Sequence, residues 1–173
     1  MDRLILLSPS PADREEILAY KAEFLAAGDS MDGTAGLRDA ASFDAWYQAV
    51  LDNASEETVR EGLVPASTFL AVDKNSGRLV GFLEIRHRLN DHLLRLGGHI
   101  GYSVRPTERR KGYATEMLAL ALEKCRELGL ARVLITCDRQ NTASSRTMLK
   151  NGAVLENEVP DGDRITQRYW ITL

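Results

Sequence analysis

Cysteine is scarce in this chain of 173 residues and long apolar runs are missing, and both facts exclude classes of protein. The only cysteines, Cys125 and Cys137, give no disulfide framework and no metal-ligand spacing. We therefore expect reduced thiols, no metal and a cytoplasmic protein. No apolar segment approaches the ~18 residues of a membrane span, and Leu4–Leu7 is too short for a signal-peptide core. The net charge of −3 argues against general nucleic-acid binding.

Two common phosphate-binding strings are missing as well, namely the Walker loop and a Gly-x-Gly-x-x-Gly directly after a strand. What the chain has instead is the segment 109–114, Arg-Arg-Lys-Gly-Tyr-Ala, between the strand-like Gly98–Val104 and the helical Gly112–Leu128. The first N–H groups of a helix lack partners and lie at the positive end of its dipole, so they can bind phosphate. Gly112 and Ala114 leave room for phosphate oxygens. Three adjacent cations add positive charge, so the segment predicts a pyrophosphate site.

Other interpretations of this loop are a solvated helix start and a basic surface for a different polyanion. A helix start normally prefers Asp or Glu to Arg or Lys, so cations at this point indicate an anionic ligand. The few cations of one turn make a poor nucleic-acid surface.

Hydrophobic periodicity and turn residues predict one domain over residues 1–173, with the order β-α-α-β-β-β-α-β-α-β-β. Such an order fits an α/β fold with a mixed central β-sheet flanked by helices. The expected strands are Arg3–Leu7, Thr68–Asp73, Arg78–Leu89, Gly98–Val104, Arg132–Cys137, Val154–Val159 and Arg164–Leu173. The expected helices are one from Pro11 to Gly28, one from the cap Ser42 through Leu51, Gly112–Leu128, Asn141–Lys150 and a single turn at Asp91–Leu96.

The string Arg109-x-x-Gly112-x-Ala114 resembles the Arg/Gln-x-x-Gly-x-Gly/Ala motif of the GNAT superfamily, the acetyl-CoA-dependent N-acetyltransferases. The strand Gly98–Val104 and the turn Arg105-Pro106 resemble the segments that precede this motif in the family. Asn141 to Arg146, followed by Lys150-Asn151-Gly152-Ala153, resembles the family's second motif. The resemblance spans about Phe69 to Val154.

The resemblance implies a single GNAT-like α/β domain that uses acetyl-CoA as co-substrate. It implies direct transfer of the acetyl group to a primary amine of a small molecule or peptide, with no nucleic-acid or membrane partner; a homodimer is left open. The implied cofactor-binding residues are Ser103, Val104, Arg109, Arg110, Lys111, Gly112, Tyr113, Ala114, Thr115, Asn141 and Ser144. For Asn141 and Ser144, helix capping is an alternative that is compatible with cofactor contact.

Two residues are candidate bases for the amine, whose own pKa lies near ~10.4 by analogy with lysine. His99 lies five residues before Val104, where many family members carry a Glu, and its ordinary pKa is close to working pH. Glu84 lies among apolar residues of the preceding strand. His99 is slightly favoured. A structural histidine, and a surface carboxylate paired with Arg86 or Arg88, are the alternatives.

Met148 departs from the family, many of whose members have a Tyr four to five residues before the second-motif glycine, here Gly152, as proton donor to the leaving thiolate. Methionine cannot donate a proton. A thiol of pKa near ~8.5 can leave as an anion, so activity is still expected. Tyr102 and Tyr113 are possible substitutes. The missing donor keeps a second hypothesis open, a non-catalytic acyl-CoA-binding or regulatory domain. The sequence does not identify the acceptor.

Overall fold

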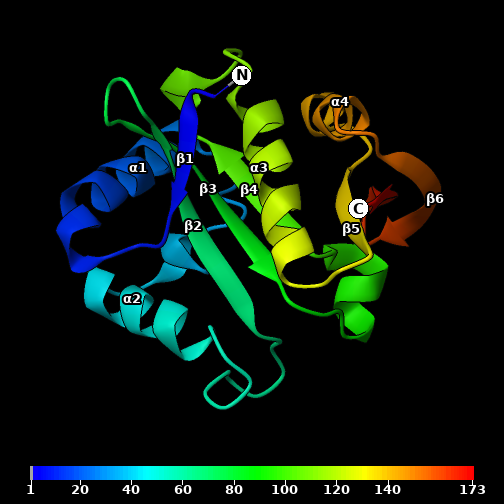
Figure 1. Cartoon of the computed structure of the whole chain (residues 1–173), viewed down its shortest axis with the longest axis horizontal. Coiled ribbons are helices and arrows are strands. Elements are labelled where there is room, and N and C mark those ends of the chain that lie inside the picture. The colour runs from blue at the N-terminus through cyan, green and yellow to red at the C-terminus, as the bar shows by residue number, and fades with distance from the viewer. Residues whose placement is uncertain (1) are drawn as a thin grey trace.

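The computed structural model describes residues 2–173 and shows strands divided between two sheets (Figure 1). Four strands, β1 (Leu4–Leu7), β2 (Ala66–Asp73), β3 (Leu79–Arg86) and β4 (Ile100–Val104), form one sheet in the order β1-β2-β3-β4. All its pairings are antiparallel, for example Leu70 with Phe82. This sheet carries the larger part of the core.

The second sheet has three strands in the order β5-β7-β6, again antiparallel. They are β5 (Arg132–Asp138), β6 (Val154–Asp161) and β7 (Arg164–Thr172). The predicted α/β class and element order are confirmed, but the expected mixed sheet is divided in two antiparallel sheets. The middle of β5 is buried, with Val133, Leu134 and Ile135 inaccessible to solvent.

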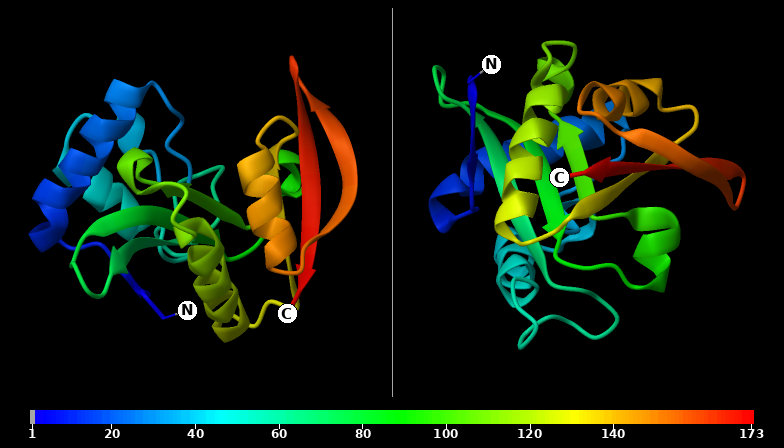
Figure 2. Two further views of the ribbon diagram at one scale, coloured as in Figure 1. Left: turned by 90° about the horizontal axis from the view of Figure 1, so that it is seen from above. Right: turned by 45° about the vertical axis from the view of Figure 1, so that its right-hand side comes forward.

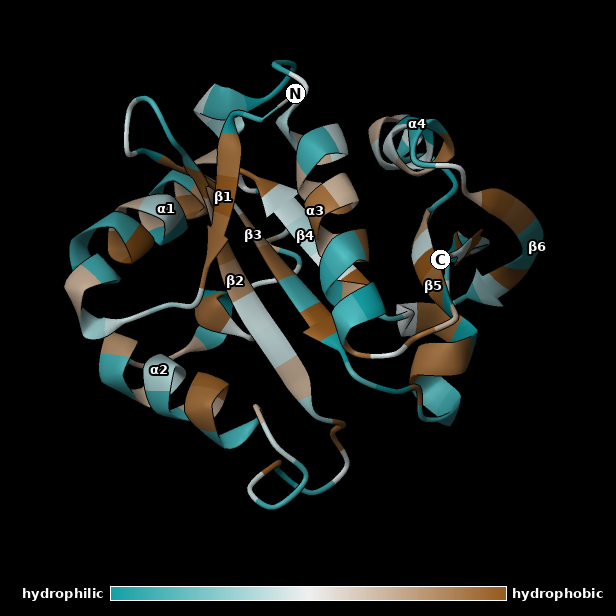
Figure 3. Ribbon diagram, viewed as in Figure 1, coloured by the Kyte–Doolittle hydropathy of each residue, from teal (hydrophilic) through white to brown (hydrophobic). Residues whose placement is uncertain are grey.

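Helices cover both faces of the four-stranded sheet (Figure 2). One face carries α1 (Arg14–Ala27) and α2 (Phe43–Asp52), whose apolar residues pack against β2 and β3. The other face carries α3 (Tyr113–Glu127), and α4 (Thr142–Lys150) packs between α3 and β5. In Figure 3, where the ribbon is coloured by hydropathy, hydrophobic segments lie along β1, β3 and β5, and hydrophilic segments alternate with them along the helices. No helix within residues 2–173 is both long and apolar enough to cross a membrane.

Short helical turns lie between the longer elements. They are η1 (Pro11–Asp13), η2 (Leu37–Asp39), η3 (Leu93–Gly97) and η4 (Pro106–Glu108). The first helix therefore begins as a 3-10 turn capped by Ser10. The strand expected to reach Leu89 ends at Arg86, whose N–H donates to the His99 carbonyl at 2.7 Å just before β4 begins.

The two sheets are joined beside His99. Its N–H donates to the Leu134 carbonyl at 2.7 Å, and the Leu134 N–H donates back to the His99 imidazole Nδ1 at 2.9 Å. Gly98 has a positive φ of 68°, and a Cβ there would lie 2.6 Å from the Leu134 oxygen, so only glycine fits. Beyond this point no backbone hydrogen bond of the described residues joins β4 to β5. A cleft lies between the two strands.

Candidate active site

A cleft of about 920 Å³ lies between β4 and β5 and is the candidate active site. Its walls come from the loop that follows α1, from β4, from the loop before α3, from the end of β5, from the start of α4 and from the β6–β7 hairpin. The predicted site residues that line it are Ser103, Val104, Arg109, Arg110, Gly112, Tyr113, Ala114, Thr115, Asn141 and Ser144. Lys111, Glu84 and His99 are not among the lining residues.

The loop before α3 has the backbone geometry that its sequence predicts. Gly112 is the N-cap of α3 with a φ of +83°, and Arg110 also has a positive φ, of 65°. A Cβ at Gly112 would meet only the Arg3 side chain, at 3.5 Å, so the glycine is required by the backbone conformation and not by a steric contact. The first residues of α3 thus lie at the cleft, where their N–H groups suit an anion.

The three loop cations do not all contribute free charge. The Arg109 guanidinium contacts the Asp29 carboxylate at 2.6 Å, donates to the Val104 carbonyl and lies over the Phe24 ring. Lys111 does not line the cleft and pairs with Glu108, which does, at 2.7 Å. Within residues 2–173, Arg110 alone of the three has no ion pair, so the expectation of three cations acting at one point is corrected.

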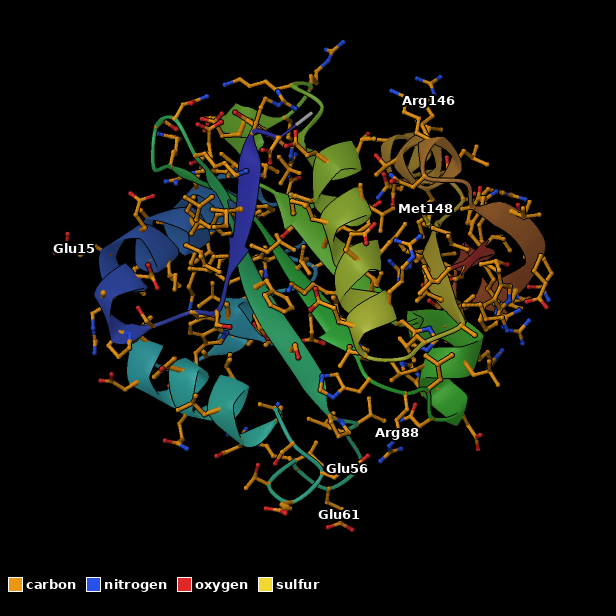
Figure 4. All side chains as sticks on the ribbon, in the orientation of Figure 1. Glu15, Glu56, Glu61, Arg88, Arg146 and Met148 are labelled. Atoms are coloured by element: carbon orange, nitrogen blue, oxygen red, sulfur yellow. The ribbon has the colours of Figure 1, made fainter. Side chains whose placement is uncertain are left out.

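Two further cations line the cleft that the sequence did not assign, Arg146 and Lys150 of α4. Neither is ion-paired within the described part of the chain. Figure 4 shows Arg146 projecting from the outer side of α4. A helical spacing of four residues places both cations on one side of α4, a signal present in the sequence. With Arg110, they make the α3–α4 side of the cleft positive.

Asn141 is the N-cap of α4, Ser144 lies in the first turn of that helix, and both line the cleft. For Asn141, capping and a position at the cleft are thus compatible. The Asn141 side-chain oxygen accepts the Ser144 N–H at 3.1 Å. The Ser144 hydroxyl lies 2.8 Å from the Tyr102 hydroxyl, which connects α4 to β4 across the cleft. Burial, above all, raises the pKa of Tyr102 to about 12, and that of the neighbouring Cys137 thiol to about 11. Both groups are therefore protonated at neutral pH.

Neither candidate base lines the cleft. His99 is buried, and its Nδ1 is occupied by the Leu134 N–H. Burial, with the positive charge of Arg86 as a second cause, lowers the pKa of His99 to about 4, so the ring is neutral at pH 7. The Glu84 carboxylate lies 3.2 Å from Nε of Arg86, which does line the cleft. This is the arginine pairing that the sequence left open as an alternative.

Met148 is fully buried in the core beside α3 and does not line the cleft (Figure 4). The two tyrosines that do are Tyr102 and Tyr113. The Tyr113 hydroxyl is engaged, because it donates to the Asp73 carboxylate at 3.0 Å. Tyr102, a residue of β4, is thus the cleft tyrosine whose hydroxyl is not bound to a carboxylate, although its sequence position differs from that of the family donor.

The fold and the cleft together define an α/β domain that presents a helix start to an anionic ligand between two diverging strands. The model of the family described as "Acetyltransferase (GNAT) domain" matches residues 3–154, and the chain belongs to this family. No curated protein is detectably similar to the chain in sequence.

Solved structures of the family have the same fold. A GNAT-family acetyltransferase from Bacillus anthracis is 20% identical with a TM-score of 0.67, covering 99% of this chain and 95% of its own. The ribosomal-protein-S5-alanine acetyltransferase from Vibrio fischeri is 16% identical with a TM-score of 0.73, over 99% and 94% of the two chains. The dodecameric spermidine N-acetyltransferase from Vibrio cholerae is 16% identical with a TM-score of 0.67, over 99% and 95%. Because these sequence identities are low, the comparisons show that the fold is shared and nothing about the substrate.

Proposed function

We propose that the protein is an N-acetyltransferase that transfers the acetyl group of acetyl-CoA directly to a primary amine of a small molecule or peptide. The observation that carries this proposal is the start of α3, which faces the cleft with Gly112 at a φ of +83° and with Arg110 beside it. The unpaired N–H groups there suit the pyrophosphate of coenzyme A. Arg146 and Lys150 add positive charge from α4.

The free edge of β4 would hold the acyl-bearing arm. In its sheet β4 pairs with β3 alone, so its other edge presents backbone groups to the cleft near Ser103 and Val104. An amide-rich chain can lie along such an edge as a further strand does. An N–H of β4 directed at the thioester oxygen would stabilise the negative charge that develops there, a contribution of roughly 3 kcal/mol.

The chemistry then needs one proton removed and one thiolate released. The amine nitrogen attacks the thioester carbon, the C–S bond breaks, and the nitrogen loses its proton to a base. We propose Glu84 or His99 as this base, each through a bridging water, because neither lines the cleft. The geometry favours Glu84, since its partner Arg86 reaches the cleft whereas His99 is buried. The thiolate leaves unaided or takes a proton from Tyr102 or water.

The alternative, a non-catalytic acyl-CoA-binding domain, is favoured by one observation, the buried Met148 where the family donor would stand. Thiol release from acetyl-CoA separates the two functions. The panel should include spermidine and ribosomal-protein N-terminal peptides, because relatives are named for both kinds of acceptor. Release with at least one amine supports the enzyme. Stabilisation by acetyl-CoA without release over the whole panel would favour the alternative.

We also propose that the chain is a single domain and works in the cytoplasm, where its two buried free cysteines would stay reduced. A homodimer is proposed as its assembly.

A further inference from the structure

The carboxylates that line the cleft differ in whether a cationic side chain lies close enough to form an ion pair with them. They belong to five residues: Asp29, Asp32, Glu108, Asp138 and Asp161. Four of them have a cation within 4 Å. Asp29 pairs with Arg109, Glu108 with Arg78 and Lys111, and both Asp138 and Asp161 with Arg164. Within residues 2–173, Asp32 alone of the five has no cationic partner.

Asp32 is exposed, and its side chain accepts only a long 3.3 Å hydrogen bond from the Ser30 hydroxyl. It therefore presents an unmatched negative charge to the cleft.

The backbone beside Asp32 is fixed against the strand that would hold the thioester. A Cβ on Gly33 would lie 2.3 Å from the Gly101 oxygen and 2.8 Å from the Tyr102 Cα, so the loop touches β4 directly. The same loop is held from α2, because the Trp46 indole N–H donates to the Thr34 carbonyl at 2.7 Å. Asp32 is thus presented from a well-anchored segment.

The charge of Asp32 is also felt at Tyr102. Burial is the main reason for the raised pKa of this tyrosine, and the Asp32 carboxylate adds to the effect. Asp32 therefore lies near β4, on the loop that follows α1.

The cations of the cleft are distributed in the opposite way. Those without an acidic partner, Arg110, Arg146 and Lys150, belong to the loop before α3 and to α4. Arg86 of β3 lies on the side of the cleft where the amine would bind, here called the acceptor side. It forms an ion pair with Glu84 and donates hydrogen bonds to the carbonyls of Gly97 and Gly98. The acceptor side therefore offers no unmatched cation for an anionic group, but it does offer one unmatched anion.

We propose that Asp32 binds a second, protonated amino group of the acceptor, so that the substrate is a diamine or a longer amine with more than one positive charge. The reacting nitrogen would lie at β4, and the second ammonium at Asp32 would stay charged throughout. This inference rests on the proposed N-acetyltransferase function and specifies its acceptor.

Three acceptors of similar length test the inference because they differ in the group at the far end. They are 1,4-diaminobutane, butylamine and 4-aminobutanoate, with a cationic, a neutral and an anionic end. We expect kcat/KM to be ~10–100-fold higher for the diamine than for butylamine, the range of a charge-assisted hydrogen bond. The anionic compound should be the poorest. A preference for 4-aminobutanoate would overturn the proposal and indicate Arg86 as the recognition residue.

Asp32→Asn should remove the preference for the diamine, lowering its kcat/KM ~10–100-fold with little change for butylamine. Asp39→Asn is the matched control, because Asp39 is an exposed acid of the same loop that does not line the cleft. Asp32→Lys should reverse the order and favour 4-aminobutanoate over the diamine. Stabilisation by acetyl-CoA verifies that each variant is folded.

The outcomes separate the two levels of the proposal. If the native protein acetylates butylamine as well as the diamine and Asp32→Asn changes neither, the enzyme function stands and the role of Asp32 is wrong. Equal losses in Asp32→Asn and Asp39→Asn would also overturn it, since they would show a diffuse charge effect. If no amine is acetylated although acetyl-CoA binds, the proposed function fails, and the role of Asp32 fails with it.

Discussion

The imidazole of His99 takes the place of a backbone acceptor for Leu134, whose N–H it accepts on Nδ1 at 2.9 Å. The His99 N–H donates to the carbonyl of the same Leu134, and its own carbonyl accepts the Arg86 N–H. One residue thus holds β3, β4 and β5 together where the two sheets part. Because β4 and β5 exchange no further backbone bonds beyond it in the described residues, the cleft begins at this residue.

We expect His99→Asn to keep kcat/KM within ~10-fold, because an amide oxygen can accept the Leu134 N–H in place of Nδ1. His99→Ala leaves that buried N–H without its acceptor and should destabilise the fold by ~1–3 kcal/mol. The measurements are kcat/KM and chemical denaturation of both His99 variants. Glu84→Gln, a variant of the other candidate base, is measured in the same way for comparison. A positioned base contributes ~10²–10⁴ in rate. A loss of that size in a stably folded His99→Asn, but not in Glu84→Gln, would identify His99 as the base.

The same histidine should make stability depend on pH. Its pKa is about 4 in the folded protein and near ~6.5 when unfolded, so the unfolded state binds more protons between these values. His99 should therefore leave stability unchanged above pH ~6.5 and lower it, by roughly 1–3 kcal/mol, as pH falls towards 4. The free energy of unfolding of the native protein and His99→Asn, followed from pH 7.5 to 4.5, tests this. The acid-side loss should shrink in His99→Asn and persist in the exposed control His92→Asn.

The backbone geometry of the loop before α3 could be predicted from the sequence because its signals are local. A glycine at the N-cap and an apolar helix period fix the start of α3 without knowledge of the rest of the chain. The charge balance of that loop could not be predicted in the same way. Arg109 is paired with Asp29, which lies 80 positions away in the chain, and only the folded chain brings the two together.

The division of the sheet was missed for a similar reason. It depends on His99 and Leu134, which lie 35 positions apart and whose pairing has no signature in either strand alone. Asp32 was missed because exposed acids are common in loops, and its lack of a partner becomes visible only when the pairs of its neighbours are known. The contact of the Ser103 hydroxyl with Tyr20 of α1, at 2.9 Å, likewise joins residues 83 positions apart and has no local signature.

Replacing Gly112 by Asp should abolish the binding of acetyl-CoA. Excess acetyl-CoA at ~100-fold above Kd should stabilise the native protein by ~2.7 kcal/mol, and a carboxylate at the helix start would repel the phosphates. Because φ is +83° at this position, the substitution also strains the backbone.

Gly129→Asp controls for that strain, since Gly129 follows the other end of α3 with a similar φ of +78° and open space around it. Both variants should lose intrinsic stability, whereas only Gly129→Asp should still be stabilised by acetyl-CoA. Thermal melts with and without ligand measure the difference. An unchanged melting temperature of the native protein in excess acetyl-CoA would show that the loop does not bind the cofactor.

Met148 should tolerate leucine and resist tyrosine, because it is fully buried in the core beside α3. Leucine has a similar volume, so Met148→Leu should cost less than ~1.5 kcal/mol and change kcat only a few-fold. Met148→Tyr would place the family's proton donor at 148 and could raise kcat if the phenol reaches the sulfur. The larger ring must enter a filled core, however, at a cost of ~1–3 kcal/mol. We therefore expect the stability loss to dominate.

Urea unfolding and kcat for acetyl transfer, measured on the same preparations, separate the two effects. A ~100-fold fall of kcat in a stable Met148→Leu would show that methionine has a specific part in the reaction, whereas a rise of kcat in Met148→Tyr would show that release of the thiolate limits the native enzyme.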